Sequence, residues 1–196
     1  MITPKEFAAR WQAEVVEALE APDEVKDQLR EDLKLVTPPP ERLTALRIPE
    51  DARQFLAEAG LPKSCGPFLT FEEVAQGLPR LWEVYSPGQW TARELVPMEP
   101  YLMLGSEGAG DPICLDERDG RVVLLDHEIH FREVRAFVNC SLPQLAESLL
   151  IYETVPAESR SEELRRIDPP AVEKGAFWWH ETRLETQRKK PWWKLW

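Results

Sequence analysis

The stretch that decides the fold is GSEGAGDPICLDERDGRVVLLDHEIHFREVRAFVNCSLPQLAESLL, residues 105–150. It contains two short apolar runs, residues 113–115 and 122–125, separated by a turn at residues 117–120 that ends in Asp-Gly. An Asp-Gly pair readily adopts the positive φ angles that tight hairpin turns require. Apolar runs on both sides of such a turn predict a β-hairpin.

A further strand and a helix follow the hairpin. Phe137 and Val138 are typical of a strand end, and the side-chain oxygens of Asn139 and Ser141 can accept hydrogen bonds from free amides at a helix start. Leucine and alanine then recur at helical spacing over residues 142–150. The chain is therefore expected to run from a strand directly into a capped, buried helix.

One core is expected to join these elements. A helix that ends at Gly60 contributes an apolar face. Residues 113 and 115, together with 122 and 124, are expected on the same side of the sheet because side chains alternate along a strand. The expected core residues are Phe55, Leu56, Ile113, Leu115, Val122, Leu124, Phe137, Leu145 and Leu149.

The remaining segments are read as short helices and strands. A capping-box spacing opens the first helix, and three prolines at residues 38–40 stop the second. Helices are expected at residues 4–20, 23–37, 158–167 and 176–187, and short strands at residues 68–71, 81–85 and 101–104. Short strands flanked by helices favour an α+β fold, with a mainly antiparallel sheet and helices packed against it.

A motif in the deciding stretch resembles a known family. The pattern G-x-x-G-x-G-D-x-I-x-x-D-x-x-x-G-x-V, followed by F-V-N-x-S-L, is similar to the SUKH superfamily and most similar to its fourth subgroup, the bacterial immunity proteins. Ile48-Pro49 resembles the start of the subgroup, and Trp178-Trp179 resembles its end. The motif positions with structural roles are Gly105, Gly108, Gly110, Asp111, Asp116, Gly120, Asn139 and Ser141.

The resemblance implies a function and a division of the chain. It implies a cytoplasmic immunity protein that binds and neutralises a cognate toxin domain, without a cofactor and without catalysis of its own. Two alternatives remain: an interaction or regulatory module of the same fold, and a small-ligand-binding or enzymatic domain. Residues 1–44 are expected to form a helical extension, residues 45–187 the SUKH-like domain, and residues 188–196 a tail.

The charge of the chain indicates the kind of partner. It has 24 Lys and Arg against 35 Asp and Glu, a formal net charge of -11. Such a charge repels phosphate backbones, so nucleic acid is not an expected partner. The same charge attracts a basic protein and speeds the encounter with it, which suits an inhibitor of a basic toxin.

Hydropathy and cysteine usage favour a reduced, cytoplasmic protein. No window approaches the roughly 18 consecutive apolar residues that a membrane span needs, and the first residues lack the apolar core of a signal peptide. The three cysteines, at positions 65, 114 and 140, form no CxxC pair. They are interpreted as small buried hydrophobic residues in preference to disulfide partners or metal ligands.

Three sequence patterns that could indicate catalysis, phosphate binding or metal binding lack the residues or the spacing that those sites need. The glycine-rich loop lacks the Lys-Ser or Lys-Thr of a phosphate-binding loop, and Asp111 would repel phosphate. His127 and His130 are three residues apart outside a helix, whereas HExxH zinc sites need a spacing of four on a helix. No nucleophile lies in a recognisable catalytic motif. The sequence therefore favours binding over catalysis.

Aromatic and acidic residues alternate around the middle of the chain. As an interface, the aromatic side chains would be anchors and the acids would provide electrostatic complementarity to a basic partner. Alternatively, the aromatic residues belong to the core and the acids form a solvated face. The candidate partner-binding residues are Trp82, Glu83, Tyr85, Trp90, Glu94, Glu99 and Glu107.

The chain ends in a cationic, aromatic tail, RKKPWWKLW, at residues 188–196. Its four cations and three tryptophans are typical of a peripheral contact, either weakly with an anionic membrane surface or with an acidic patch of another molecule. The alternative is a tail folded back on its own domain. The expected contact residues are Lys189, Lys190, Trp192, Trp193 and Trp196.

Overall fold

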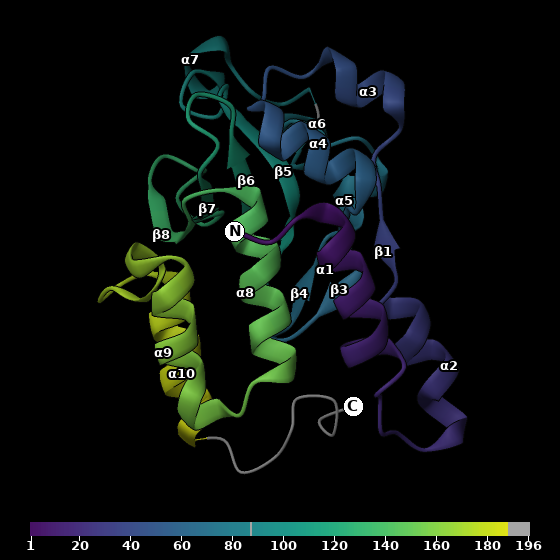
Figure 1. The fold of residues 1–196 in the computed structure, drawn as a ribbon. Helices are drawn as coiled ribbons and strands as arrows, with labels where there is room; N and C mark the ends of the chain where they lie inside the picture. Colours follow the sequence, from purple (N-terminus) through teal and green to yellow (C-terminus); the bar gives the residue numbers. More distant parts are fainter. Residues whose placement is uncertain (87, 188–196) are drawn as a thin grey trace.

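A six-stranded antiparallel sheet lies at the centre of the fold (Figure 1). The computed structural model describes residues 1–86 and 88–187. Each strand pairs with the next one along the sequence. In their order across the sheet, the strands are β3 Ser64–Cys65, β4 Leu69–Thr70, β5 Tyr101–Ser106, β6 Pro112–Asp116, β7 Val122–Leu125 and β8 Val134–Asn139. A second, two-stranded sheet pairs β1, Leu35–Val36, with β2, Leu61–Pro62.

Helices pack around the sheet and make the fold α+β, which confirms the expected fold class. None of the described helices combines the length and the apolarity needed to cross a membrane. The helices are α1 Pro4–Arg10, the π-helix η1 Trp11–Val16, α2 Asp23–Asp32, α3 Pro40–Ala45, α4 Glu50–Glu58, α5 Glu72–Ala75, α6 Leu81–Val84, α7 Ala92–Leu95, α8 Leu142–Thr154, α9 Ala157–Ile167, the 3-10 helix η2 Pro169–Val172 and α10 Phe177–Gln187.

The hairpin of β6 and β7 has the expected register. Ile113 pairs with Leu124, and Leu115 pairs with Val122. All four side chains lie in the main core, on the inner face of the sheet. The residues that alternate with them face a second, outer cluster on the other side of the sheet; these are Cys114, Val123 and Leu125.

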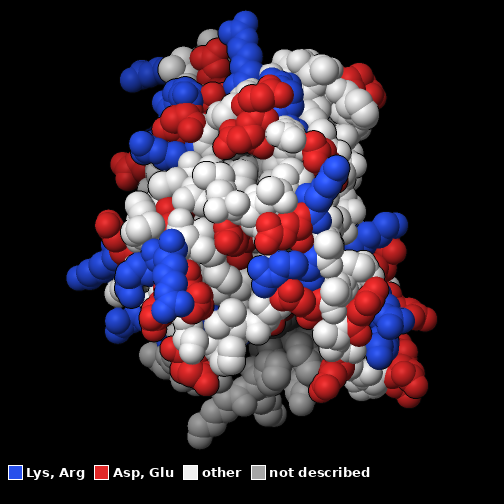
Figure 2. All heavy atoms as spheres, in the orientation of Figure 1, with Lys and Arg blue, Asp and Glu red and all other residues white. Residues whose placement is uncertain are grey.

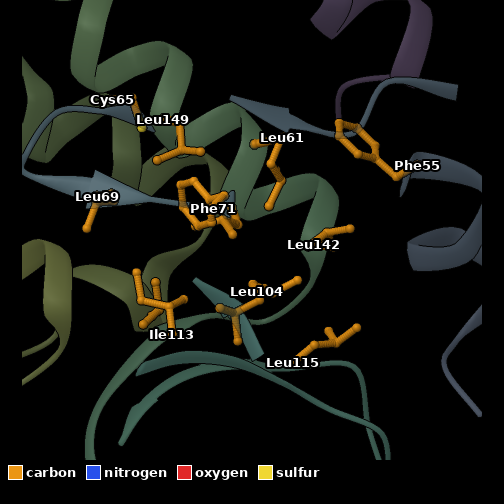
Figure 3. Packing of buried hydrophobic residues seen from close by; sticks show 14 of the residues in the cluster. Phe55, Leu61, Cys65, Leu69, Phe71, Leu104, Ile113, Leu115, Leu142 and Leu149 are labelled. Carbon is orange, nitrogen blue, oxygen red and sulfur yellow. The ribbon is translucent and has the colours of Figure 1, made fainter. Parts of the chain in front are cut away.

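The main core lies between the inner face of the sheet and the helices α1, α4 and α8. Figure 3 shows Leu142 and Leu149 of α8 among the side chains of Phe71, Leu104 and Ile113. The expected core residues are buried, except for Phe137, which is half-buried and packs at the edge of the core. Burial of this continuous apolar surface is the main source of stability.

The N-terminal helices contribute side chains to the same core. The ring of Phe7 in α1 lies 5.4 Å from the ring of Phe55 in α4. The indole nitrogen of Trp11 donates a 2.8 Å hydrogen bond to the carbonyl oxygen of Leu33. Residues 1–44 therefore pack into the main core as well as against its surface.

Three expected elements differ from the structure. Residues 81–85 were expected as a strand but begin with the helix α6, because the Glu83 carboxylate accepts the Arg80 amide and holds a helical turn. The first helical stretch ends at residue 16 and not near residue 20. The second helix ends at residue 32, because the residues after it pair with β2.

A buried polar network joins β8 to the C-terminal helices. Asn139 donates through its side-chain nitrogen to Ser148 Oγ at 3.1 Å and to Asp168 Oδ2 at 3.0 Å, and its side-chain oxygen accepts from Trp178 Nε1 at 2.9 Å. The expected capping role of Asn139 is therefore wrong, since its side chain points into this network. Ser141 caps α8 as expected, accepting from the Gln144 amide at 3.4 Å.

Candidate interaction surface

The segment of residues 79–100, which contains α6 and α7, covers the outer face of the sheet. Both of its ends are fixed to the sheet region by backbone hydrogen bonds. The Met103 amide donates to the Pro79 carbonyl at 2.9 Å, and the Glu117 amide donates to the Pro100 carbonyl at 2.8 Å. Leu81 and Met98 of the segment are fully buried in the outer cluster. The segment is thus a fixed layer over the sheet.

The candidate aromatic residues hold this layer in place and remain half-buried. The Tyr85 ring lies 4.8 Å from the ring of Phe131, which comes from the β7–β8 loop, residues 126–133. The Tyr85 hydroxyl donates to the Gly110 carbonyl at 2.9 Å, and Trp90 Nε1 donates to the Tyr85 carbonyl at 2.7 Å. Trp82 is also half-buried, below the guanidinium of Arg80 at 5.9 Å. Burial raises the pKa of Tyr85 to about 12, so its hydroxyl stays a donor.

Three of the four candidate acids stabilise local backbone. Glu83 accepts the Arg80 amide at 2.7 Å, and Glu107 accepts the Asp111 amide at 3.2 Å. Glu94 accepts the Thr91 amide at 2.9 Å and the Thr91 hydroxyl at 2.6 Å, and these bonds lower its pKa. The fourth acid, Glu99, is exposed. Its backbone carbonyl accepts a hydrogen bond from the Arg80 guanidinium at 2.6 Å.

Asp111 fastens the β7–β8 loop to the loop between β5 and β6. Its carboxylate is 1% exposed and accepts from the backbone amide of His127 at 3.0 Å and from His127 Nδ1 at 2.6 Å. Arg135 forms an ion pair with its second oxygen. Within the described residues, no three His, Cys, Asp or Glu side chains gather where they could hold a metal ion.

The β7–β8 loop turns sharply and exposes its tip. His130 and Phe131 both have φ of 58°, a left-handed conformation that residues other than glycine rarely adopt. Phe131 is held in the outer cluster, and the Asp126 carboxylate accepts the Glu128 amide at 2.8 Å. Such locally strained backbone persists only where packing imposes it, and it clusters at functional sites. Ile129 is left 40% exposed at the tip of the loop.

The residues of the family motif have structural positions. A Cβ on Gly105 would lie 1.7 Å from the carbonyl oxygen of Thr70, so only glycine fits there between β5 and β4. Gly120 ends the hairpin turn at φ of 78°. Gly108 and Gly110 lie in the exposed loop before Asp111.

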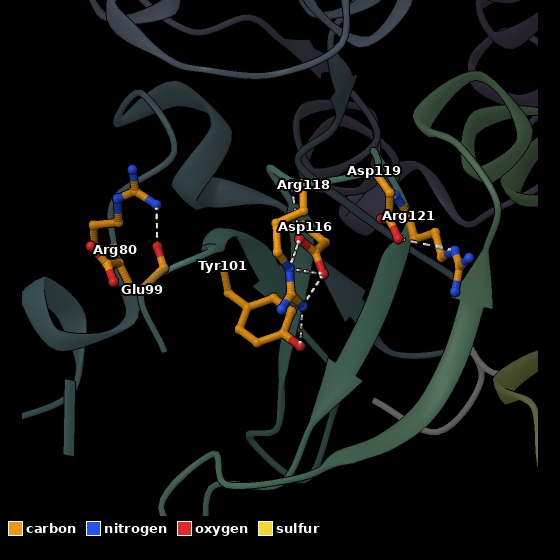
Figure 4. A network of polar contacts seen from close by, with 7 residues as sticks. All are labelled: Arg80, Glu99, Tyr101, Asp116, Arg118, Asp119 and Arg121. Atoms are coloured by element: carbon orange, nitrogen blue, oxygen red, sulfur yellow. Dashed lines mark hydrogen bonds and ion pairs between the residues drawn. The ribbon is translucent and has the colours of Figure 1, made fainter. Parts of the chain in front are cut away.

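Asp116 forms an ion pair with Arg118 at the turn of the β6–β7 hairpin. Figure 4 shows the Arg118 guanidinium between the Asp116 carboxylate and the Tyr101 hydroxyl. Its Nη2 donates to Asp116 Oδ2 at 2.5 Å and to the Tyr101 hydroxyl at 3.3 Å. Burial raises the pKa of Asp116, but the hydrogen bonds and charge of Arg118 outweigh burial and leave the pKa below its ordinary value. At the same turn, Arg121 pairs with Asp119 at 3.2 Å. These charges are satisfied within the chain.

Four large apolar side chains remain exposed on the 79–100 segment and in or next to the β7–β8 loop. Large apolar residues that remain exposed in one region of a folded protein mark interaction sites. We call the surface that they form the outer surface. Its apolar residues are Val84, Val96, Ile129 and Val134, which are 37%, 66%, 40% and 45% exposed.

A hollow of about 590 Å³ opens on the outer surface, beside α7. Residues from the 79–100 segment and the β7–β8 loop line it together. Sequence reasoning did not identify its basic members, because no spacing pattern relates two segments that meet only in the folded chain. The lining residues are Thr91, Arg93, Glu94, Pro97, His130 and Arg132.

The net charge of -11 is not concentrated in one area of the face seen in Figure 2, where acidic and basic side chains are interspersed with uncharged surface. Local pairs account for part of this pattern, such as Arg80 with Glu117 at 2.7 Å. The expected tail contacts at residues 188–196 lie outside the described residues.

The fold defines a class of protein: an antiparallel sheet covered by helices. The chain belongs to the SUKH-4 immunity protein family, whose family model matches residues 3–185. The match confirms the resemblance to the fourth SUKH subgroup. It also includes the N-terminal helices, which precede the motifs that carry the resemblance. No curated protein and no solved structure shows a significant match to the chain.

Proposed function

We propose that this immunity protein acts in the cytoplasm by binding a cognate toxin domain and blocking it, without catalysis of its own. Membership of the SUKH-4 immunity family is the observation that carries the proposal. The sequence supports a basic toxin, since a net charge of -11 favours the approach of a positively charged partner.

The outer surface is the proposed docking face. It combines exposed apolar side chains with half-buried tryptophan and tyrosine, the residue types that anchor protein interfaces. The fixed ends of the 79–100 segment support this choice, because a preorganised surface loses little entropy on binding.

The experiment is co-expression with a candidate toxin domain chosen from the neighbouring genes, followed by calorimetry on the purified pair. We expect growth protection and a 1:1 complex. Val96→Asp and Ile129→Asp should weaken binding, because each places a charge in an apolar contact. Val25→Asp on α2, which is 45% exposed, is the matched control and should bind like the unmodified chain.

Each outcome of this experiment separates the alternatives. Protection without a complex would contradict direct blocking. A complex that Val25→Asp weakens as much as Ile129→Asp would place the docking face elsewhere. No protection by a folded protein would reject the proposed immunity function against this toxin.

A further inference from the structure

The hollow beside α7 is lined by two arginines that are not engaged in ion pairs among the residues that the structure describes. Arg93 and Arg132 line it, and neither forms an ion pair with another of the described residues. Four other arginines of the sheet and its cover do have partners: Arg80 with Glu117, Arg118 with Asp116, Arg121 with Asp119 and Arg135 with Asp111. The hollow therefore brings together two guanidinium groups that keep hydrogen-bond donors available.

A second hollow, between α1, α8 and α9, provides the comparison. It has a volume of about 510 Å³ and also contains two arginines. Arg10 pairs there with Glu14 at 2.8 Å, and Arg166 pairs with Glu163 at 2.5 Å. Both of its arginines are thus paired with acids of the chain, unlike Arg93 and Arg132.

The single acid in the hollow beside α7 is already engaged. Glu94 is held by the amide and the hydroxyl of Thr91, at 2.9 Å and 2.6 Å. These bonds, together with the charges of His130 and Arg132, lower its pKa and keep it ionised. Its carboxylate is thereby fixed on the backbone, and the two guanidinium groups keep donors free for another acceptor.

Two exposed apolar residues are the chain neighbours of residues that line the hollow: Val96 precedes Pro97, and Ile129 precedes His130. Val96 and Ile129 are 66% and 40% exposed, and the ring of Trp90 meets the ring of His130 edge-on at 5.8 Å. Arginine and tryptophan are among the residue types enriched at the energetically dominant positions of protein interfaces. A guanidinium group binds a carboxylate with two parallel hydrogen bonds, a geometry that lysine does not offer.

We infer that the hollow beside α7 binds a carboxylate of the partner protein, an Asp or Glu side chain that pairs with Arg93 and Arg132 and is flanked by an apolar residue resting on Val96 and Ile129. The inference deepens the proposed function, on which it rests, by specifying the chemistry of the contact. It agrees with a basic toxin, because net charge governs the long-range approach, whereas one acidic residue of that toxin is enough to occupy the hollow.

The test uses the full chain, the double variant R93E/R132E and the control R165E. Arg165 is exposed on α9, well away from α7 in Figure 1, and, like both hollow arginines, it forms no ion pair with another described residue. The first probe is a phage library of random dodecapeptides. We expect the unmodified chain and R165E to select peptides with Asp or Glu beside an apolar residue, and R93E/R132E to lose that selection. Equal selection by the double variant, or selected peptides without acids, would overturn the inference.

The second probe is the candidate toxin domain chosen from the neighbouring genes. We expect R93E/R132E to raise its Kd at least about tenfold, and R165E to change it by less than about twofold. If the toxin binds R93E/R132E as tightly as the unmodified chain, the inference falls while the proposed function stands. If the toxin binds none of the three proteins, the proposed function fails for that toxin, and the peptide selection alone decides the inference.

Two controls complete the design. Thermal melts of R93E/R132E and R165E should match that of the unmodified chain; if the double variant does not fold, R93Q/R132Q replaces it and should still lose peptide selection. A fluorescein-labelled single-stranded oligonucleotide tests the other source of negative charge. Binding of that oligonucleotide that depends on Arg93 and Arg132 would identify a phosphate site and overturn the inference.

Discussion

The indole nitrogen of Trp178 donates a 2.9 Å hydrogen bond to the side-chain oxygen of Asn139, which lies 39 positions earlier in the chain. Both residues are fully buried. The bond connects α10, near the end of the described chain, to the last strand of the sheet. Because the Asn139 amide also donates to Ser148 and Asp168, this single side chain ties β8, α8 and the C-terminal helices together.

Trp178→Phe should therefore destabilise the fold more than its size change suggests. The substitution leaves the Asn139 oxygen buried without a donor, which costs about 1–3 kcal/mol, and adds a small cavity. The matched control is Trp179→Phe, at the half-buried neighbouring position, with an expected loss below about 1 kcal/mol. Urea unfolding followed by circular dichroism compares them. Equal losses would show that the Asn139 bond contributes nothing measurable.

Leu149→Ala should lower the free energy of unfolding by about 2–5 kcal/mol, because the side chain is fully buried between α8 and the sheet. Val25→Ala on α2, at a 45% exposed position, should stay within about 0.5 kcal/mol of the unmodified protein. Chemical denaturation measures both. A loss below about 1 kcal/mol for Leu149→Ala would mean that α8 is not packed as described.

Glu73→Gln should stabilise the protein at neutral pH and have no effect in acid. Burial raises the pKa of Glu73, and its Oε2 is buried without a hydrogen-bond partner. A raised folded-state pKa means that stability is fully present below the unfolded pKa and is lost as the pH rises through the folded value. Because the Glu73 side chain is partly exposed, solvent screening keeps the gain at pH 7 small.

The control for this pH effect is Glu72→Gln, at the exposed neighbour that pairs with Lys63 at 3.5 Å. Urea midpoints at pH 4 and pH 7 are the measurement for both variants. Glu72→Gln should leave the midpoint unchanged or slightly lower at pH 7. A lower midpoint for Glu73→Gln at pH 7 would show that the carboxylate is favourably solvated in the folded protein.

The half-buried thiol of Cys140 should be nearly inert in the native protein. Burial, the hydrogen bond to Asp168 and the negative charge of Asp168 raise its pKa to about 11. At pH 8 only about 0.1% is thiolate, against about a quarter for an ordinary cysteine. Cys65 and Cys114 are buried, and burial raises both of their pKa values. We expect slow reaction with Ellman's reagent in buffer and rapid reaction of all three in urea; fast native labelling at pH 8 would contradict this.

Reversal of the candidate acids should slow association with a basic toxin, most strongly at low ionic strength. Glu99→Lys is the clearest variant, because Glu83, Glu94 and Glu107 also hold local backbone through their carboxylates. Stopped-flow rates at two salt concentrations measure the effect. An unchanged rate at low salt would show that this part of the surface does not steer the partner.

The sequence was sufficient for the elements whose pattern is local. Alternation predicted the hairpin faces, and helical spacing with Ser141 at the cap predicted α8. The pattern LWEVY at residues 81–85 was read as a strand, but a backbone contact of Glu83 makes its first four residues a helix, which alternation cannot reveal. The helices at residues 158–167 and 176–187 were predicted almost to the residue.

The candidate site was less accessible to sequence reasoning. The sequence indicated the aromatic residues of the 79–100 segment as candidates by their residue type alone. The structure brings two of them, Tyr85 and Trp90, together around Phe131. Arg93 and Arg132 could not be recognised, because what distinguishes them is the absence of an ion-pair partner among the described residues, a tertiary property. Asn139 was assigned to the helix cap because its three partners, 9, 29 and 39 residues further along the chain, are brought to it only by the fold.

The consecutive order of the strands has an evolutionary consequence. The 79–100 segment is an excursion between two neighbouring strands, β4 and β5, which pair through Thr70 and Ser106. Its exposed side chains can change without shifting the register of β5, β6, β7 and β8, because other residues make those pairings, whereas Leu81 and Met98 must stay apolar to cover the outer cluster. Relatives that inherit the same sheet can therefore differ in the exposed positions of this one excursion.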